Sequence, residues 1–189
     1  ESLDNKILQH KTEKDIESIY CDSKDNLWIG TDGELAVREF RSGGLQRTVP
    51  NLPGSVSSIA VSEDGLLFCG FDDLFKLGTL YDIKSGSVLK RMLQNTEKGS
   101  TAAFTNDGRL VSVDTVNNIT IWDVKELKVL HKLEGHLHGV SAIVLTPDGR
   151  IVSGAGDHTI KVWDLESGQL LQTFEGHTDA VVGLAMAGE

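Results

Sequence analysis

The sequence has 189 residues and a formal net charge of −10, with 39% hydrophobic and 24% charged residues. This composition is that of a globular domain and excludes a disordered chain. No apolar run approaches the roughly eighteen residues that span a bilayer, so we expect no membrane partner. The negative charge argues against nucleic acid as a partner, because binding to phosphates depends on Lys and Arg.

The start of the chain and its two cysteines bear on the compartment. Glu1 stands in place of Met, and no basic stretch leads into an apolar one, so no signal peptide is visible and a longer parent chain is expected. Cys21 and Cys69 lie in apolar runs, where we expect buried, reduced thiols rather than a disulfide framework. These features favour a cytoplasmic location, with the nucleus as an alternative.

Aromatic residues recur with a constant spacing along the chain. Phe40, Tyr81, Trp122 and Trp163 are 41 residues apart, and Asp follows the last three. A turn signal precedes each aromatic, at 23–26, 62–65, 105–108 and 146–149. Asx-Gly and related pairs supply the positive φ that tight hairpins need. A second signal, Ser-Gly, follows three of the aromatics at 42–43, 85–86 and 167–168.

In chain order these signals divide the sequence into units of four short strands, which we name a, b, c and d. Residues 1–12 contain strand d of a preceding unit, four units follow at about 13–53, 54–96, 97–136 and 137–177, and residues 178–189 contain strand a of a following unit. The segments 150–153 and 159–163 are rich in β-branched and aromatic residues, and no segment has a helical period. The chain is predicted to be all-β.

Each unit of four strands cannot bury both faces of its sheet alone, so neighbouring units must stack. Four-stranded blades stacked around an axis form a β-propeller. Length changes fall in turns: the distance from turn to aromatic is 14 residues in repeats one, three and four, but 16 in repeat two. This places a two-residue insertion in the second b–c hairpin, around 71–74. Repeat one lacks two residues after Phe40, which we assign to its c–d turn.

The fourth repeat resembles the WD-repeat family. Gly135-His136 opens it, Val162-Trp163-Asp164 ends its third strand, and Gly176-His177 follows 41 residues after the first Gly-His. The resemblance implies a propeller that usually has seven blades. These four complete blades would then be part of a larger ring, completed by more of the parent chain or by a second copy. The first repeat, with Asp-Asn-Leu-Trp-Ile-Gly-Thr-Asp-Gly at 25–33, also resembles the propeller repeats of bacterial two-component sensors.

The resemblance to the WD-repeat family also implies a structural tetrad at His136, Ser153, Asp157 and Trp163. A buried indole N–H or imidazole without a partner would cost about 1–3 kcal/mol, which is the physical reason for such a set. His, Ser and Asp together could suggest a hydrolase, but a nucleophilic serine must be exposed beside an oxyanion hole. Ser153 lies in a predicted central strand, so we expect no catalytic residue and no enzyme.

The other repeats depart from this pattern. Repeat three keeps Ser112 and Trp122 but has Val116 where Asp157 aligns, and repeats one and two have no Gly-His. We therefore expect the first three blades to be held by apolar packing and to be less rigid than the fourth. The histidines and the Asp72-Asp73 pair do not complete a set of metal ligands, so no metal and no cofactor are expected.

Function on a rigid scaffold is expected on its loops. In the WD-repeat family the b–c and d–a connections share one face that commonly binds proteins, so the resemblance implies a non-catalytic scaffold for other proteins or peptides. The alternatives are a ligand-sensing propeller of the two-component type and, less favoured, a propeller enzyme. The candidate partner surface comprises Lys14, Asp15, Ser55, Asp72, Asp73, Lys98, Thr115, Leu137, His138, Thr178 and Asp179.

Overall fold

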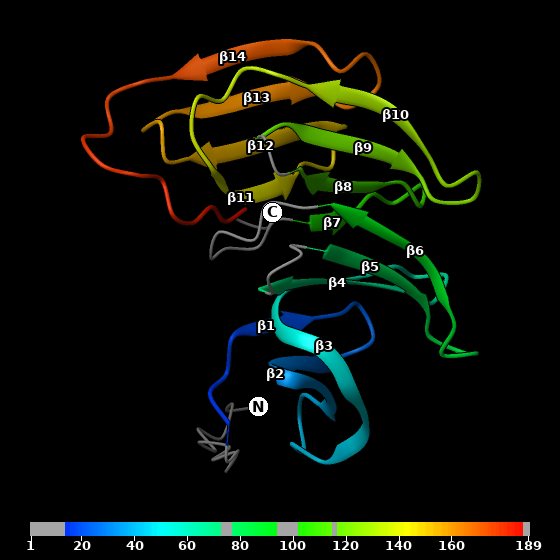
Figure 1. The fold of residues 1–189 in the computed structure, drawn as a ribbon. Coiled ribbons are helices and arrows are strands. Elements are labelled where there is room, and N and C mark those ends of the chain that lie inside the picture. The colour runs from blue at the N-terminus through cyan, green and yellow to red at the C-terminus, as the bar shows by residue number, and fades with distance from the viewer. Residues whose placement is uncertain (1–13, 73–76, 94–101, 115–116, 187–189) are drawn as a thin grey trace, which may run out of the picture.

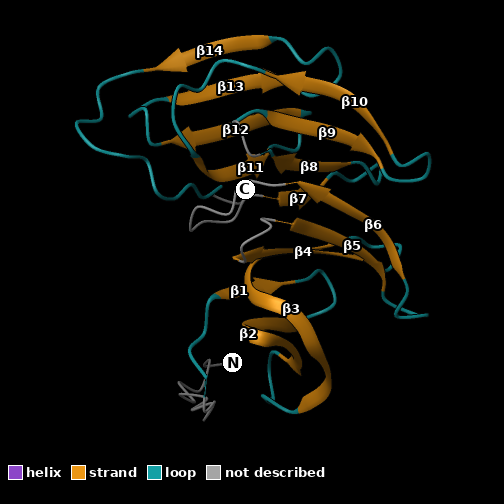
Figure 2. Ribbon diagram, viewed as in Figure 1, coloured by secondary structure: helices purple, strands orange, loops and turns teal. Residues whose placement is uncertain are grey.

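The structure is a computed structural model, and it describes residues 14–72, 77–93, 102–114 and 117–186. These residues form β-strands joined by turns and loops (Figure 2). No described residue belongs to a helix long and apolar enough to cross a membrane. The prediction of an all-β chain is confirmed.

The second half of the chain forms two separate four-stranded antiparallel sheets. The first contains β7 (Ala102–Phe104), β8 (Leu110–Val113), β9 (Ile119–Asp123) and β10 (Lys128–Leu133). The second contains β11 (Val140–Leu145), β12 (Arg150–Ala155), β13 (Ile160–Asp164) and β14 (Leu170–Phe174). In each sheet the strands pair in chain order, so β7 and β11 are strand a, and β10 and β14 are strand d, of a meander blade.

The first half of the chain forms one continuous six-stranded sheet rather than two separate sheets. Its strands are β1 (Ser18–Cys21), β2 (Asn26–Glu39), β3 (Leu45–Val61), β4 (Leu66–Asp72), β5 (Leu77–Asp82) and β6 (Val88–Leu93). β2 spans the predicted strands b and c of the first blade, and β3 spans its strand d and strand a of the second. A single pair between the two blades, Asp32 with Ser55, continues the ladder from one to the other.

The structure corrects the alignment of the first repeat. Trp163 pairs with Leu170 across the c–d hairpin, next to a shift in register, and the residue with this pairing in the first blade is Arg38, opposite Leu45. Phe40 lies two residues further along the chain and is 51% exposed. The prediction that Phe40 is the counterpart of Trp163 is therefore wrong.

The turn before strand b explains this error. Its residue with positive φ is Asp25, at φ 58°, where the later repeats have glycine, so the sequence alignment on Asn26 was one residue too late. The c–d turn of the first blade has the ordinary length, because the Gly43 N–H bonds to the Glu39 carbonyl as the Gly168 N–H bonds to the Asp164 carbonyl. The predicted loss of two residues in that turn is also wrong.

The length differences lie instead in the b–c hairpins. Matching positions on strands b and c are eleven residues apart in the first blade (Leu27 and Arg38) and twelve in the fourth (Ile151 and Trp163). In the second blade the distance is fourteen, from Leu67 to Tyr81. The predicted two-residue insertion in the second hairpin is confirmed, although residues 73–76 lie outside the described part of the chain.

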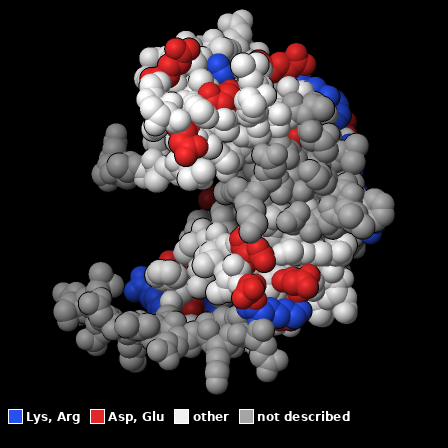
Figure 3. Space-filling view, turned by 60° about the vertical axis from the view of Figure 1, so that its left-hand side comes forward, with Lys and Arg blue, Asp and Glu red and all other residues white. Residues whose placement is uncertain are grey.

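The hydrophobic core lies between consecutive blades. One buried cluster joins β8, β9 and β10 to β11, β12 and β13, and includes Val111, Ile121, Val140, Ile151 and Trp163. Two further clusters lie in the same way between the first and second blades and between the second and third. The inner strands β1, β3, β7 and β11 contact one another in that order. The blades are thus stacked face to face in an arc (Figure 1) around a hollow that is open on one side (Figure 3).

The two cysteines differ in burial. Cys69 is fully buried in β4, and burial raises the pKa of its thiol above the ordinary range. Cys21 is exposed, so the prediction of a buried thiol is wrong for this residue. Cys21 is the last residue of β1, whose side chains alternate between half-buried and exposed, and it falls on the exposed side.

Residues 178–186 run past the last sheet without forming a strand. Val181 is nevertheless buried against the fourth blade: its N–H donates to the carbonyl of Ala155 (3.1 Å), and its carbonyl accepts a hydrogen bond from the Ser141 hydroxyl.

Val56 lies in the part of β3 that is strand a of the second blade, and it contacts the preceding blade in the same way as Val181. Its carbonyl accepts a hydrogen bond from the Ser18 hydroxyl of the first blade. A methyl group at Gly30 would meet Val56 at 2.8 Å, and one at Gly154 would meet Val181 at 2.5 Å. Residues 178–186 therefore occupy the place that strand a of a following blade would take.

Candidate functional site

The fourth blade contains a hydrogen-bonded chain of four side chains. The indole N–H of Trp163 donates to the hydroxyl of Ser153 (2.9 Å), which lies 2.8 Å from Nε2 of His136. Nδ1 of His136 lies 2.9 Å from the carboxylate of Asp157. The strands explain the arrangement, because Ser153 on β12 and Trp163 on β13 lie on the same face of the sheet, two residues apart in register. The four residues of the tetrad expected from sequence thus lie together.

Hydrogen-bond chemistry fixes the direction of this chain. The ionised carboxylate of Asp157 can only accept, so Nδ1 of the neutral His136 carries the proton and donates it to Asp157. Nε2 is then an acceptor, and the Ser153 hydroxyl, which accepts the Trp163 indole N–H, donates to it. Burial lowers the pKa of His136 below its ordinary value of 6.5, against the opposing effect of Asp157. The neutral imidazole is therefore the form that this arrangement stabilises.

Asp157 is the anionic end of the tetrad. Burial opposes its ionisation, but hydrogen bonds from Thr159, Leu137 and His136 outweigh that effect and hold the pKa of Asp157 well below its ordinary value of 3.8. Its carboxylate accepts the backbone N–H of Leu137 (2.9 Å) and the backbone N–H and hydroxyl of Thr159 (3.0 and 2.7 Å). Asp157 therefore joins the d–a loop to the b–c loop at one end of the blade.

The tetrad positions of the other blades hold different residues. In the third blade the Trp122 indole donates to the Ser112 hydroxyl (3.0 Å), and Val116, at the position of Asp157, lies outside the described residues. In the second blade Cys69 takes the serine position, opposite Thr79 as Ser153 is opposite Lys161.

The first blade uses a different polar contact. Trp28 lies on β2, one residue before the position that aligns with Ser153. Its indole donates to the carboxylate of Asp22 (2.9 Å) in the a–b turn. This pair was not predicted, because Trp28 had been aligned only as part of a strand.

The structure divides the predicted partner surface into two groups. In the first, the Lys14 ammonium donates to the Asp32 carbonyl (2.6 Å), Asp32 pairs with Ser55, and Ser55 pairs with Asp72. Asp15 is exposed next to Lys14.

The second group lies on the fourth blade. Leu137, His138, Thr178 and Asp179 are all exposed there. No hydrogen bond or strand pairing among the described residues joins the two groups. The remaining predicted residues, Asp73, Lys98 and Thr115, lie outside the described part of the chain.

Leu137 is the most exposed large hydrophobic residue of the described chain, at 82%, and Val182 follows at 77%. Leu137 directly follows the tetrad residue His136, and its N–H is held by the Asp157 carboxylate (2.9 Å). The Gly156 N–H bonds to the Gly139 carbonyl (2.9 Å) and closes the other side of the same loop. The backbone that carries the exposed Leu137 side chain is therefore held by hydrogen bonds on both sides of its loop.

Other kinds of site have little support in the described residues. No three His, Cys, Asp or Glu side chains in residues 14–72, 77–93, 102–114 and 117–186 come together in a way that could hold a metal ion. A pocket of about 380 Å³ lies among the a–b and c–d turns, and no residue of the predicted surface lines it. Sequence reasoning missed this pocket, because its walls come from strands and turns that are far apart in the sequence.

Comparison with known proteins agrees with this architecture. The family model of the WD domain, G-beta repeat, matches residues 127–164, and that of the two component regulator propeller matches residues 11–33. No curated protein matches the chain significantly.

Two solved structures with a similar fold show how much of a propeller the chain represents. The crystal structure of the C-terminal WD40 domain of Sif2 is 18% identical, with a TM-score of 0.76 over 88% of this chain and 48% of that one. The computationally designed Ika8 protein is 24% identical, with a TM-score of 0.71 over 92% of this chain and 53% of that one. The chain spans about half the length of these structures, and the likeness at such identities shows the fold.

Fold, repeat and comparisons together define the class of protein. The chain has the fold of part of a β-propeller, and one of its repeats, at residues 127–164, matches the family model of the WD domain, G-beta repeat. The repeat that the family model matches covers strand β10 and the fourth blade up to Asp164.

Proposed function

We propose that the chain is part of a non-catalytic scaffold that binds other proteins or peptides through the loops between strands b and c and between blades. The observation that supports this most directly is the exposed Leu137, whose backbone is fixed by the buried tetrad. Thr178 and Asp179, in the segment after β14, are also exposed and polar. Such a surface provides an anchor and a polar rim, which are the usual parts of a protein interface.

The only His-Ser-Asp set predicted from the sequence does not favour hydrolysis. Ser153 is fully buried, and its hydroxyl is engaged by both Trp163 and His136. A nucleophilic serine needs access to substrate and a hydroxyl free to attack it. The geometry therefore supports a structural role for these residues. We also propose a reducing compartment, the cytoplasm or nucleus, since both cysteines are free thiols.

Site-specific photo-crosslinking in cells tests the proposed partner surface. A photoreactive amino acid at Leu137 of the full-length protein is expected to capture a defined partner. The same amino acid at Leu171, which is 51% exposed on the outer strand β14, serves as the control. The purified partner should then bind the protein directly and lose affinity for Leu137→Asp. Equal capture from both positions, or unchanged affinity for the variant, would reject the proposed surface.

A ligand-sensing propeller is a second candidate, favoured by the match of residues 11–33 to the two component regulator propeller. The sequence of the parent protein distinguishes the two. Further Gly-His and Trp-Asp repeats support the scaffold, whereas a membrane span followed by a signalling domain supports the sensor.

A further inference from the structure

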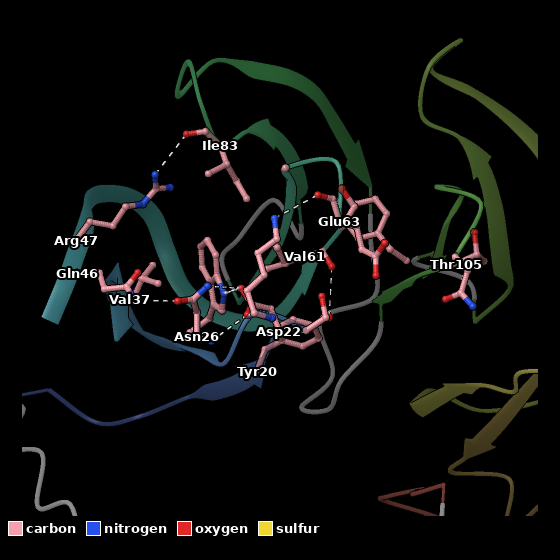
Figure 4. Close-up of a pocket in the computed structure, with 17 residues that line it drawn as sticks. Tyr20, Asp22, Asn26, Val37, Gln46, Arg47, Val61, Glu63, Ile83 and Thr105 are labelled. Atoms are coloured by element: carbon pink, nitrogen blue, oxygen red, sulfur yellow. Dashed lines mark hydrogen bonds between the residues drawn. The ribbon is translucent and has the colours of Figure 1, made fainter. Parts of the chain in front are cut away.

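The pocket of about 380 Å³ lies mainly between the first and second blades and is bordered by 104–106 of the third, at the end of the sheets that carries the a–b and c–d turns. In a meander sheet this end is opposite to the b–c and d–a connections, so the pocket is separate from the proposed partner surface. Tyr20, Trp28, Val61 and Ile83 form its apolar wall (Figure 4). The pocket is open to solvent and has room for one side chain with part of its backbone.

Two cations reach across this pocket without meeting an acid. The Lys24 ammonium lies 3.5 Å from the carbonyl oxygen of Glu63, and the Arg47 guanidinium lies 3.4 Å from that of Ile83 (Figure 4). Both distances are at the outer limit of a hydrogen bond, and both acceptors are neutral. Arg47 also lies over the ring of Trp28, 5.8 Å from its centroid. Within the described chain neither cation has an ion pair.

Two acidic side chains, Asp22 and Glu63, line the same pocket, and neither forms an ion pair with Lys24 or Arg47 in the described chain. The carboxylate of Asp22 accepts hydrogen bonds from Trp28, from Asn26 and from the backbone N–H of Lys24. Burial opposes its ionisation, but these bonds outweigh burial and hold the pKa of Asp22 below its ordinary value. Asp22 is therefore ionised, and its carboxylate oxygens bind groups of the turn and Trp28 rather than the Lys24 or Arg47 side chains. Glu63 offers its backbone carbonyl to Lys24, and its side chain is exposed.

The groove between the third and fourth blades provides an internal comparison. Its volume is about 320 Å³, and Leu145, Gly149 and Leu165 take the places of Val61, Gly65 and Ile83. There Arg109 pairs with Asp107 (2.7 Å) and reaches across to Glu166 (2.5 Å). At the positions of Arg109 and Glu166, the groove between the first and second blades has Asn26 and Lys84. One groove thus supplies the carboxylates for its own cation, whereas the other has a further lysine at its edge.

We propose that the groove between the first two blades binds an acidic peptide segment of a partner protein, with an apolar side chain flanked by carboxylates. The apolar side chain lies against Tyr20, Val61 and Ile83. The carboxylates replace the two weak carbonyl contacts of Lys24 and Arg47 with charge-assisted hydrogen bonds, as Glu166 does for Arg109. The chain as a whole carries a net charge of −10, so this recognition depends on the local cations rather than on long-range attraction.

Fluorescence anisotropy with the full-length protein tests this proposal. The probe is a fluorescein-labelled peptide with the central sequence Asp-Leu-Asp, compared with peptides in which the centre is Asn-Leu-Asn or Asp-Ser-Asp. We expect the first to bind at least about tenfold more tightly than either of the others, with an affinity that falls as salt rises. Equal binding of all three peptides, or no binding of the first, would overturn the proposal.

Two variants locate the binding in the groove. Lys24→Gln with Arg47→Gln is expected to weaken the Asp-Leu-Asp peptide about tenfold or more, and Lys84→Glu, an exposed change that copies Glu166, about threefold or more. Lys125→Glu with Lys128→Glu, exposed on the turn of the third blade, is the control for net charge and should have little effect. The proposal fails if the groove variants bind like the wild type, or if the control weakens binding as much as they do. Leu137→Asp should leave this peptide unaffected, so loss of the partner surface and loss of the groove are distinguishable.

Discussion

Ser153 connects the polar groups at the centre of the fourth blade. It is fully buried, its hydroxyl accepts a hydrogen bond from the Trp163 indole, and it donates one to the His136 imidazole. Each member of the tetrad satisfies the next, so removing one strands at least one buried polar group, at a cost of about 1–3 kcal/mol. In the second blade Cys69, a weak hydrogen-bond acceptor, accompanies Tyr81, which has no indole N–H to satisfy.

Replacing Trp163 by Ala is expected to destabilise the protein far more than replacing Phe40 by Ala. Trp163 is 1% exposed, and its loss empties core space at about 3–5 kcal/mol in addition to freeing the Ser153 hydroxyl. Phe40 is 51% exposed, so its truncation should cost less than about 1 kcal/mol. Urea melts of both variants measure the difference. Similar losses would contradict the buried role of Trp163.

His136 should make stability depend on pH. Its pKa is lowered on folding, so the unfolded chain binds the proton more readily, and stability is lost as pH falls below the unfolded value of about 6.5. Urea melts between about pH 7.5 and 5.5 should show this decline in the wild type and a smaller one in His136→Gln. His177→Gln, a change at an exposed histidine, is the control and should keep the wild-type slope. An unchanged slope in His136→Gln would show that another group is responsible.

Two glycines, which have no side chain, allow a strand to pack closely against strand a of the next blade. Gly30 on β2 faces Val56, and Gly154 on β12 faces Val181, so each glycine admits the first strand of the next blade. Register decides which residue occupies such a position, since a shift of one residue turns every side chain to the other face.

Gly30→Ala is therefore expected to destabilise the protein by about 1–3 kcal/mol, because the new methyl group meets the backbone and side chain of Val56 at 2.8 Å. Gly183→Ala is the matched control, since nothing lies within 4 Å of a methyl group there. Thermal melts of the two variants compare them. A Gly30→Ala protein as stable as the control would mean that β3 can move away from β2.

Sequence reasoning succeeded for elements whose turn signals and aromatic residues coincide. The tetrad residues could be placed because the fourth repeat, with its Gly-His and Trp-Asp pairs, resembles the WD-repeat family, and that resemblance implies them. The first repeat was misaligned because Asp25 takes a left-handed conformation that glycine usually takes, and because Phe40 stands where an aromatic was expected. The groove was not predictable, since Lys24 and Arg47 contact carbonyl oxygens of the second blade only when the first two blades pack together.

At the scale of the whole molecule, polar contacts are distributed unevenly along the arc. The fourth blade has the full tetrad, the third has only the Trp122–Ser112 bond, and the second has neither indole nor imidazole at these positions. Apolar packing between blades continues throughout.

Hydrogen exchange followed residue by residue is expected to reflect this gradient. Amides of β12 and β13 should exchange more slowly than those of β4 and β5, because opening the fourth blade exposes a polar network as well as apolar surface. Mass spectrometry of exchange in the intact protein measures both sets. Faster exchange in β12 and β13 than in β4 and β5 would show that the tetrad does not set local stability.

The repeated contact at Val56 and Val181 has a consequence for synthesis on the ribosome. A finished blade already presents a serine hydroxyl, a backbone carbonyl and a glycine surface to the next segment of chain that emerges. These contacts join strand a to the preceding blade and do not involve strands b, c and d of its own blade. Blades made in chain order are therefore expected to join the propeller one at a time, beginning at strand a.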